Sequence, residues 1–460
     1  MSRWNLGWLL GITGVILLGY TVSNSAPTRE KDRDYQLVRL LVDVLDEVEH
    51  KYVRPIDDDA KRKLVEDMIN GGLSRLDPHS SFINPKDYKR FAVVNKGRFG
   101  GVGIQLGDPK NEYLTVASPL IDTPAYEAGI LPGDVILKVD GKSTQRMPVG
   151  DAIELITGDP GTKVVLTILH EGHKDPIDVE LTRADIKVPS VLGDTLEPNN
   201  PRNWDYLIDK TNKIAYIRLI SFGENTSKEL RSALEQIQKD GARGLILDLR
   251  ANPGGLLRSA VEVSRLFIPE GRIVSTRGRE QQEDIYEAHG EDVFFQPAKS
   301  FPIAILIDHM SASASEIVAA AMQDHHRAVI VGERSYGKGS VQNVIEMEDR
   351  ASALKLTTAS YWRPNGKNIH RFPDNKESDE WGVRPDEGFE IKLSVEERSQ
   401  YYDYRRKRDI TPDKPGQSKP DEHKNNKAEA KPYTDRVLDR ALQYIRQELR
   451  SPTTAAADSK

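Results

Sequence analysis

Residues 303–342 read IAILIDHMSASASEIVAAAMQDHHRAVIVGERSYGKGSVQ, and this stretch decides the fold of the largest part of the chain. An apolar, strand-like run ends at Asp308, small residues follow, and a helix is predicted whose first turn begins near Ser313. A second strand-like run, AVIVG, comes after the helix. Strands that alternate with helices in this way predict an α/β domain.

The same stretch holds a candidate nucleophile and a candidate base. A serine at the N-terminus of a helix, such as Ser313, lies among unpaired backbone N–H groups that stabilise an oxyanion. Taken alone, Ser311, Ser313 and Ser315 would be ordinary helix caps. Lys338 favours the catalytic interpretation because it lies between two glycines, where the backbone comes close to another segment. A lysine whose pKa is lowered by desolvation can take the proton of a serine hydroxyl.

Three other interpretations of this stretch are weaker. Residues 332–339 nearly spell a phosphate-binding P-loop, but Gly339 stands where the Ser or Thr that binds magnesium belongs. Residues 335–338 match the S-x-x-K of penicillin-binding enzymes, but no S-D-N or K-T-G follows. His325 and His326 could suggest a metal site, but no carboxylate or third histidine lies at ligand spacing from them. We therefore expect neither a metal site nor a cofactor.

Length and composition set broader limits. A chain of 460 residues is expected to hold several domains. Its hydrophobic fraction of 38% and charged fraction of 30% are typical of a globular protein with polar segments. The net charge of −6 provides no broad basic field, so nucleic acid is not an expected partner. The absence of cysteine excludes disulfides, thiolate metal sites and a cysteine nucleophile.

The N-terminus predicts export. Residues 6–22 (LGWLLGITGVILLGYTV) form an uncharged apolar run after Arg3, which is typical of an export signal. Its 17 residues are few for a spanning helix and many for a signal-peptide core, so residues 1–26 are either a cleaved signal or a retained membrane anchor. We expect an extracytoplasmic protein, in the periplasm or cell envelope, that contacts a membrane only through this segment.

The remaining sequence divides into five regions. Residues 34–91 are predicted to be helical, and residues 97–185 predict a β-rich module because short apolar runs alternate with Gly, Pro and Asp. Residues 186–400 form the α/β domain. Residues 401–431 are charged and almost free of aliphatic side chains, which predicts a disordered linker. A last helix is predicted within residues 432–450.

Some of the predicted helices have specific signals. Apolar residues recur every three or four positions over residues 37–48, and a second helix is predicted from about Asp59 to Leu73. The pattern Thr-Ser-Lys-Glu at residues 226–229 predicts a capping box that starts a helix of the α/β domain. The last helix carries an apolar face that is expected to dock on another part of the protein: Val437, Leu438, Ala441, Leu442 and Ile445.

Two composite motifs make the chain resemble the C-terminal processing peptidases, also called tail-specific proteases. The motifs are residues 311–317 (SASASEI) and 336–342 (YGKGSVQ), and the resemblance covers residues 37–395. It implies a multidomain α/β and β protein, in which a helical N-terminal region and a β-rich module accompany a crotonase-like α/β serine protease core.

The resemblance also implies roles for individual residues. Ser313 would be the nucleophile and Lys338, 25 residues later, the general base. Gln342 would be the third catalytic residue. Two backbone N–H groups would hold the oxyanion. One would come from Ala314 and the other from the glycine pair of the sequence Asn-Pro-Gly-Gly, where the choice between Gly254 and Gly255 stays open.

Residues 97–185 resemble a PDZ domain, most clearly in the string AGILPGDVI at residues 128–136. A PDZ domain binds a terminal carboxylate with successive backbone N–H groups and pairs the next strand with the peptide. The resemblance places the carboxylate-binding loop at four residues: Gly101, Val102, Gly103 and Ile104.

The predicted function is a serine endopeptidase that captures the C-terminus of an exported or envelope protein in its PDZ module and cleaves that protein. Its expected partners are protein substrates with accessible C-termini, while an adaptor protein and a homo-oligomer stay open. Two other classes remain. One is a PDZ-bearing, peptide-binding scaffold with an inactive protease domain, which the intact Ser313, Lys338 and Gln342 argue against. The other is an acyl-CoA enzyme on the crotonase-like fold, in which Lys338 would have no role.

Overall fold

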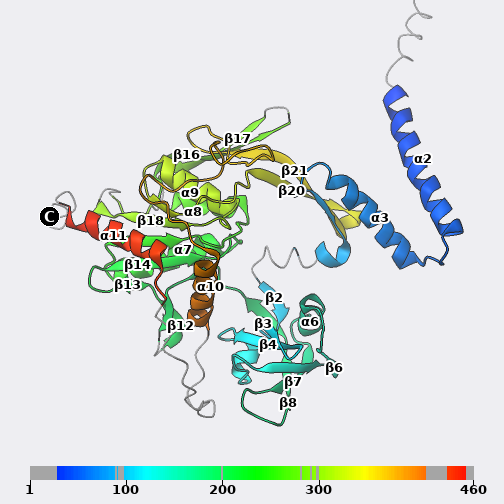
Figure 1. The fold of residues 1–460 in the computed structure, drawn as a ribbon, viewed down its shortest axis with the longest axis horizontal. Coiled ribbons are helices and arrows are strands. Elements are labelled where there is room, and N and C mark those ends of the chain that lie inside the picture. The colour runs from blue at the N-terminus through cyan, green and yellow to red at the C-terminus, as the bar shows by residue number, and fades with distance from the viewer. Residues whose placement is uncertain are drawn as a thin grey trace, which may run out of the picture. The chain divides into compact units, whose positions relative to one another are not determined.

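The computed structural model describes residues 28–88, 91, 98–197, 200–279, 282–290, 293–296, 300–410 and 433–451 (Figure 1). The predicted signal or anchor at residues 6–22 lies outside this set. Within it, no helix has both the length and the apolar character needed to cross a membrane. The chain forms two compact units, of which the first ends at Phe82, whereas the sequence placed the end of the helical region near Phe91.

The N-terminal unit contains the two predicted helices, α2 (Thr28–Lys51) and α3 (Asp58–Leu73). α3 begins after Asp57, whose carboxylate accepts the N–H of Ala60 at 2.8 Å and so caps the helix. The apolar positions that indicated α2 include several exposed side chains: Leu37, Leu40, Leu41 and Val44.

The β-rich module is built on an antiparallel sheet. Its strands lie in the order β3 (Ile104–Lys110), β4 (Tyr113–Pro119), β5 (Val135–Val139), β7 (Lys163–Leu169) and β8 (Ile177–Thr182), with β6 (Lys142–Ser143) beside β5. The module also contains β2 (Arg98–Gly101), which pairs with β9 (Ala184–Lys187), and the helices α5 (Pro124–Glu127) and α6 (Val149–Ile156). Alternate residues of β7 point into the core, as the period of two along a strand requires: Val164, Leu166 and Ile168.

A second sheet forms the centre of the α/β domain. Its strands lie in the order β10 (Val191–Leu192), β14 (Ile214–Leu219), β15 (Gly244–Asp248), β18 (Ile303–Ile307) and β19 (Val329–Gly332), with β13 (Leu207–Asp209) beside β14. From β14 to β19 each strand runs parallel to the next. Every residue of β14, β15 and β18 is buried, which is typical of a parallel sheet covered on both faces.

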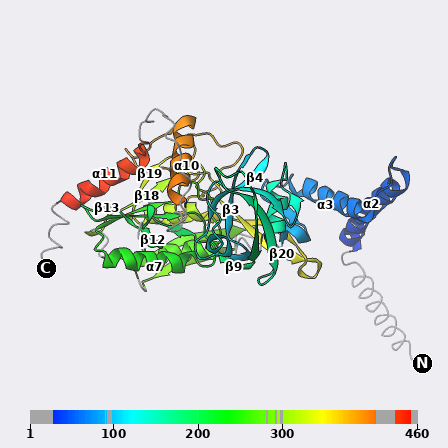
Figure 2. The ribbon, with the colours of Figure 1, turned by 90° about the horizontal axis from the view of Figure 1, so that it is seen from below.

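Helices cover the two faces of this sheet, as Figure 2 shows for α7 and α11. One layer contains α7 (Thr226–Lys239), α8 (Leu257–Arg265) and α9 (Ala314–Asp324), and the other contains α11 (Arg436–Arg450). In β15, Leu245 and Leu247 pack toward the first layer, and Ile246 between them packs toward α11. The apolar face predicted for the last helix is confirmed, because all five of its residues are buried.

A further antiparallel sheet includes the strand that follows Lys338. It contains β20 (Ser340–Met347), β21 (Ser352–Trp362), β16 (Glu270–Gly278) and β17 (Glu283–His289), paired in this order. The 3-10 turn η2 (Glu348–Arg350) joins β20 to β21, and a separate hairpin pairs β11 (Thr195–Glu197) with β12 (Asn200–Asp205). This arrangement places Gln342 near the start of a paired strand.

The capping box predicted at the start of α7 is wrong. The N-cap is Asn225, and it makes no side-chain cap hydrogen bond. Thr226 Oγ1 instead accepts the N–H of Gly223 at 2.9 Å, and the Glu229 carboxylate accepts the N–H of Ser190 at 2.7 Å. Thr226 and Glu229 therefore make hydrogen bonds to other backbone groups instead of the two bonds of a capping box.

The linker predicted at residues 401–431 begins too early. Helix α10 (Val395–Asp409) runs through its first part, and residues 411–432 lie outside the described chain. Tyr401 and Arg405 are each only 5% exposed, and Arg405 pairs with Asp194 at 3.1 Å. An aromatic ring and an arginine stem bury apolar surface without any aliphatic residue, which explains why composition did not predict this helix.

Candidate active site

Ser313 lies where the segment after β18 passes into α9. It directly precedes the first helical residue, Ala314, as the sequence predicted. Its backbone adopts φ 55° and ψ −113°, which is unusual for a residue with a side chain and is a form of strain that is common at functional sites. The first N–H of a helix has no intrahelical acceptor, so the N–H of Ala314 is available beside Ser313.

Glu316 joins the Ser313 turn to the Lys338 loop. It is fully buried, and its Oε2 accepts the backbone N–H groups of Ser313 and Lys338, each at 2.8 Å. Its Oε1 accepts the N–H of Gly337 and the hydroxyl of Ser335, each at 2.6 Å. Burial raises the pKa of Glu316 to about 7, while these hydrogen bonds act in the opposite direction. A single carboxylate therefore holds two distant segments of the chain together.

Lys338 is half-buried in the loop before β20. Burial lowers the pKa of its amine below the usual 10.5, the positive charge of Lys355 lowers it further, and the charge of Glu316 raises it. A lowered pKa is what a general base needs, because only the neutral amine can accept a proton. The burial of Lys338 and the charge of Lys355 therefore shift its protonation equilibrium toward the neutral amine.

The glycines on either side of Lys338 allow a close approach of the backbone, as predicted. A Cβ atom at Gly339 would lie 2.2 Å from the backbone nitrogen of His370. A Cβ atom at Gly337 would lie 2.7 Å from Cβ of Arg371. Both distances are impossible for real atoms, so side chains at these two positions would displace the loop that carries the lysine.

Gln342 lies in β20, and its side-chain amide donates to Ser340 Oγ at 2.8 Å and to Thr357 Oγ1 at 3.3 Å. Among the hydrogen bonds of the described residues, none joins Lys338 Nζ to Ser313 Oγ or to Gln342. The backbones of Ser313 and Lys338 are thus brought together through Glu316, whereas no hydrogen bond in the described part of the chain joins the side chains of the three predicted catalytic residues. Such contacts often become short only when substrate binds.

The loop of residues 252–255 lies against Ser313. A Cβ atom at Gly254 would be 2.8 Å from both Ser313 Cβ and the nitrogen of Ala314, and its φ of +96° also favours glycine. The N–H of Gly254 donates to Asn252 Oδ1 at 2.9 Å. No hydrogen bond of the described residues uses the N–H of Gly255. Of the two glycines, Gly255 is therefore the one whose N–H is available to a ligand.

The serines on either side of Ser313 have structural partners. Ser311 Oγ donates to the carbonyl of Leu249 at 2.8 Å, and Ser315 Oγ donates to the carbonyl of Asn252 at 3.0 Å. Both serines are completely buried. Their hydroxyl groups connect the chain around Ser313 to the segment that follows β15.

The predicted carboxylate-binding loop connects β2 to β3, beginning at Gly101 and ending at Ile104. Gly103 has φ +79°, and a Cβ atom there would lie 2.3 Å from Cβ of Thr123. β3 is the last strand in the described order of its sheet, so one edge is open to a peptide strand. In the same module, α6 carries exposed apolar side chains at Val149 and Ile153.

Sequence reasoning missed three residues of this site. Glu316 had a signal, because Ser313 and Glu316 match the S-x-x-E spacing of a capping box. Asn252 had a local signal, because an asparagine in a turn sequence such as Asn-Pro-Gly-Gly can bond the backbone two residues later. Lys355 had none, since its charge acts on Lys338 only through the fold. The histidine predicted not to bind metal, His325, contacts the carbonyl of Arg272 at 2.7 Å, and no cluster suited to a metal ion occurs among the described residues.

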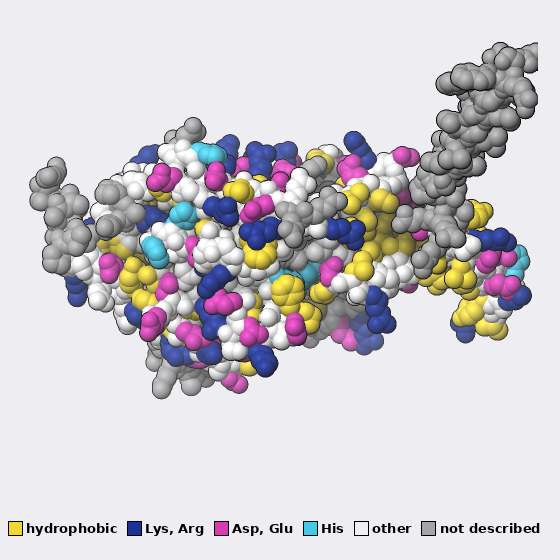
Figure 3. Space-filling model, turned by 90° about the horizontal axis from the view of Figure 1, so that it is seen from above, with side chains coloured by type: hydrophobic (Ala, Val, Ile, Leu, Met, Phe, Trp, Pro, Cys, Tyr) yellow, Lys and Arg dark blue, Asp and Glu magenta, His cyan; other side chains and the backbone are white. Residues whose placement is uncertain are grey.

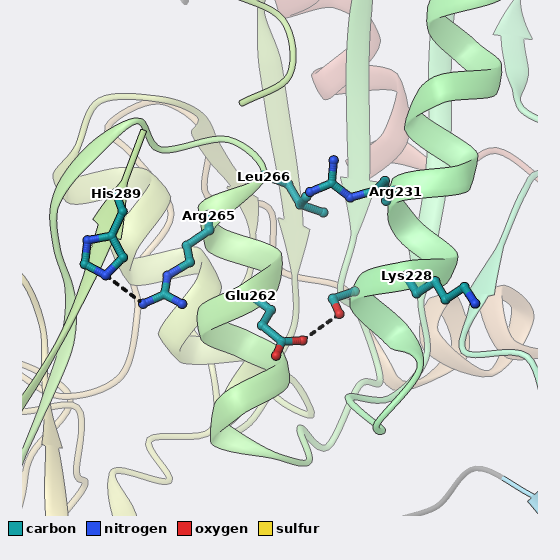
Figure 4. Close-up of a pocket in the computed structure, with 7 residues that line it drawn as sticks. Lys228, Arg231, Glu262, Arg265, Leu266 and His289 are labelled. Carbon is teal, nitrogen blue, oxygen red and sulfur yellow. Dashed lines mark hydrogen bonds between the residues drawn. The ribbon is translucent and has the colours of Figure 1, made fainter. Parts of the chain in front are cut away.

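Other surface features lie away from these residues. A cavity of about 360 Å³ is lined by residues of α7, α8 and β17 and by Leu266, and it contains hydrogen bonds from Ser227 to Glu262 and between Arg265 and His289 (Figure 4). None of the predicted catalytic residues lines it. On the face drawn in Figure 3, basic and acidic side chains are interspersed.

Known protein families match both the α/β domain and the β-rich module. The sequence profile of peptidase family S41 matches residues 213–387, and that of the PDZ domain matches residues 115–169. A carboxy-terminal-processing protease of Bartonella bacilliformis is 40% identical over 365 residues, which cover 78% of this chain and 79% of that protein. A carboxyl-terminal-processing protease of Synechocystis is 36% identical over 403 residues, covering 85% and 88%. The solved photosystem II D1 C-terminal processing protease is 28% identical, covers 76% of this chain and 86% of its own, and has a TM-score of 0.41.

A serine-type peptidase with an attached PDZ domain is the class that these matches define. The chain belongs to peptidase family S41 and, within it, to the carboxy-terminal processing proteases. The predicted multidomain fold and the predicted endopeptidase activity are thereby confirmed.

Proposed function

We propose that this protease binds the C-terminus of a protein substrate in its PDZ module and cleaves the substrate with Ser313 as nucleophile and Lys338 as general base. The observation that carries the assignment is the shared hydrogen bond acceptor, Glu316 Oε2, which receives the backbone N–H of both residues at 2.8 Å. This contact holds the strained serine turn close to a lysine whose pKa burial has lowered.

The first half of the reaction forms an acyl-enzyme. Neutral Lys338 takes the proton of the Ser313 hydroxyl while Oγ attacks the carbonyl carbon of the scissile peptide bond. The carbonyl oxygen becomes an oxyanion that accepts hydrogen bonds from the N–H groups of Ala314 and of Gly255, the glycine of the pair that is not already bonded. The C–N bond then breaks, and the lysine ammonium gives its proton to the leaving amine.

The second half releases the acyl group. A water molecule loses its proton to Lys338 and attacks the ester carbon, and the proton returns to Ser313 Oγ as the ester bond breaks. Gln342 would orient the lysine amine by turning its amide from Ser340 toward Lys338. A half-buried lysine is suited to this sequence, because it can exist as a neutral base and still stabilise the charge it acquires.

The PDZ module would select the substrate. The N–H groups of the loop from Gly101 to Ile104, including those of Val102 and Gly103, would bind the terminal carboxylate. β3 would pair with the residues that precede the carboxylate, since its edge is open among the described strands. The exposed apolar residues of α6 favour substrates with apolar termini.

Exported or envelope proteins are the proposed substrates. The support is the apolar run at residues 6–22, which is typical of an export signal or an anchor. Cell fractionation with an antibody against the α/β domain tests this location, and recovery of the protein only in the cytosol would contradict it.

The assignment of the nucleophile is tested with an unfolded protein that ends in apolar residues, whose fragments are identified by intact mass spectrometry. Ser313→Ala should reduce cleavage by about 10⁶-fold, as is typical when a nucleophile is lost. Ser311→Ala and Ser315→Ala are matched controls, because each removes a buried hydrogen bond and should lower Tm while most activity remains. Ser313→Ala activity within about tenfold of wild type would assign the wrong serine. A wild type that binds the substrate without cleaving it would favour the scaffold.

A further inference from the structure

The C-terminal helix α11 contacts the segment that leads to the oxyanion glycines. Asp435, the N-cap of α11, faces Arg250, whose Nη1 donates to Oδ1 at 3.0 Å and whose Nη2 donates to Oδ2 at 2.9 Å. The side chain of Arg250 is only 2% exposed and that of Asp435 only 7%. A bidentate pair of this kind fixes the orientation of the guanidinium as well as its distance.

Arg250 is held from other directions as well. Its Nη2 donates to Asp248, at the end of β15, at 2.6 Å. The ring of Tyr401, from α10, lies 4.2 Å from the guanidinium carbon. Two segments that follow the catalytic residues in sequence, α10 and α11, therefore meet at one side chain of the α/β domain.

Arg250 lies two residues before the loop of residues 252–255, which contains the two glycines. Ala251 follows with φ +57°, a left-handed conformation that a residue with a side chain adopts only when surrounding contacts hold it. Its N–H donates to Asp308 Oδ1 at 3.0 Å. Asn252 comes next and bonds Gly254 through its side chain. Three residues therefore separate Arg250 from Gly254, and two of them make hydrogen bonds that fix the path of this segment.

We propose that Asp435 is a positioning residue of this protease, through which the C-terminal helix holds the oxyanion loop in place by way of Arg250. This inference rests on the proposed function, because it takes the N–H groups of Gly255 and Ala314 as oxyanion donors. It gives the segment after residue 432 a role in catalysis in addition to its packing on the central sheet.

The test uses the full-length protein with the substitution Asp435→Asn. Asparagine caps a helix about as well as aspartate, so the hydrogen bond to the N–H of Leu438 is retained while the charged pair with Arg250 is lost. The matched control is Leu442→Ala, which loosens the packing of the same helix and leaves Asp435 in place. Both variants are assayed at a temperature where unfolding curves show each to be fully folded.

We expect kcat of Asp435→Asn for a quenched peptide to fall by about 10- to 100-fold, because small displacements of catalytic groups have effects of this size. KM and the pH dependence should not change, since neither the PDZ module nor Lys338 is affected. Leu442→Ala should lower Tm at least as much and keep kcat within about twofold of wild type.

Three results would overturn the inference. An unchanged kcat in Asp435→Asn would mean that the ion pair only stabilises the fold. An equal fall of kcat in both variants would mean that the helix acts through general packing. Continued cleavage by Ser313→Ala would refute the proposed function, and the inference with it, and this result is recognised in the same assay.

Discussion

Ser313 and Lys338 lie 25 residues apart in the sequence, yet both donate their backbone N–H to the same oxygen atom of Glu316, each at 2.8 Å. Their two nitrogen atoms can therefore be separated by no more than twice that distance. The turn that carries Ser313, the proposed nucleophile, and the loop that carries Lys338, the proposed base, are therefore held together by this carboxylate. The arrangement predicts how substitutions of the lysine, of its charged neighbours and of the substrate terminus affect the reaction.

Lys338→Arg should be as inactive as Lys338→Ala. A guanidinium keeps its proton at any usable pH, so it cannot take the proton of Ser313 although its charge and length resemble those of lysine. Lys338→His is expected to keep a trace of activity with a pH limb at lower values. The measurement is kcat/KM against pH in the presence of a chelator, which also tests metal independence. Substantial activity in Lys338→Arg would mean that the lysine acts only as an electrostatic or structural group.

Lys355→Gln should move the pH limb of the reaction to higher pH. The positive charge of Lys355 contributes to the lowered pKa of Lys338, so its removal lets that pKa rise toward the usual value. More of the lysine is then protonated at neutral pH, where the rate should fall, whereas the rate at high pH should stay the same. Lys355→Arg keeps the charge and serves as the control. A limb that stays in place in Lys355→Gln would assign it to another group.

Glu316→Gln should change the shape of the pH profile. The pKa of Glu316 is raised to about 7, and its ionised carboxylate is the form that accepts four hydrogen bonds. At a pH below the pKa values of both Glu316 and Lys338, each of the two groups must lose a proton before the enzyme is active. A plot of log kcat/KM against pH should therefore rise with a slope approaching two. The glutamine variant should show a slope of one.

The maximal rate of Glu316→Gln should also fall by about tenfold or more, because an amide has one acceptor oxygen and turns N–H groups toward donors. Circular dichroism at each pH verifies that the variant is folded. A slope of one in the wild type would contradict the role of Glu316, as would full activity of the variant.

Amidation of a substrate's C-terminus should raise KM by about tenfold or more, since hydrogen bonds to a charged group contribute about 1.5–3 kcal/mol. kcat should change little, because the catalytic residues are not involved. Fluorescence anisotropy with Ser313→Ala measures the binding of the free-acid and amidated peptides without cleavage. Equal affinity and equal turnover of both peptides would remove the capture role and favour a module that only packs on the protease or covers its active site.

Local patterns in the sequence determined several features correctly. The alternation of apolar runs with helical periods predicted the α/β domain, and the apolar face of the last helix predicted its burial. The S-A-S-A-S-E and Y-G-K-G motifs predicted the family. Each of these features follows from the types and the spacing of residues along a single segment. Residue type and spacing do not depend on the contacts that the segment makes in the folded protein.

Only the tertiary structure decided the features that depend on distances between remote segments. Thr226 is not a cap because the surrounding loop uses its hydroxyl, and α10 extends to Asp409 because Tyr401 and Arg405 find buried partners. The lowered pKa of Lys338 comes from burial and from Lys355, and Asp435 reaches Arg250 across 185 residues. A sequence lists the donors, acceptors and charges of these contacts, but the interactions depend on separations of a few ångströms that exist only after the chain has folded.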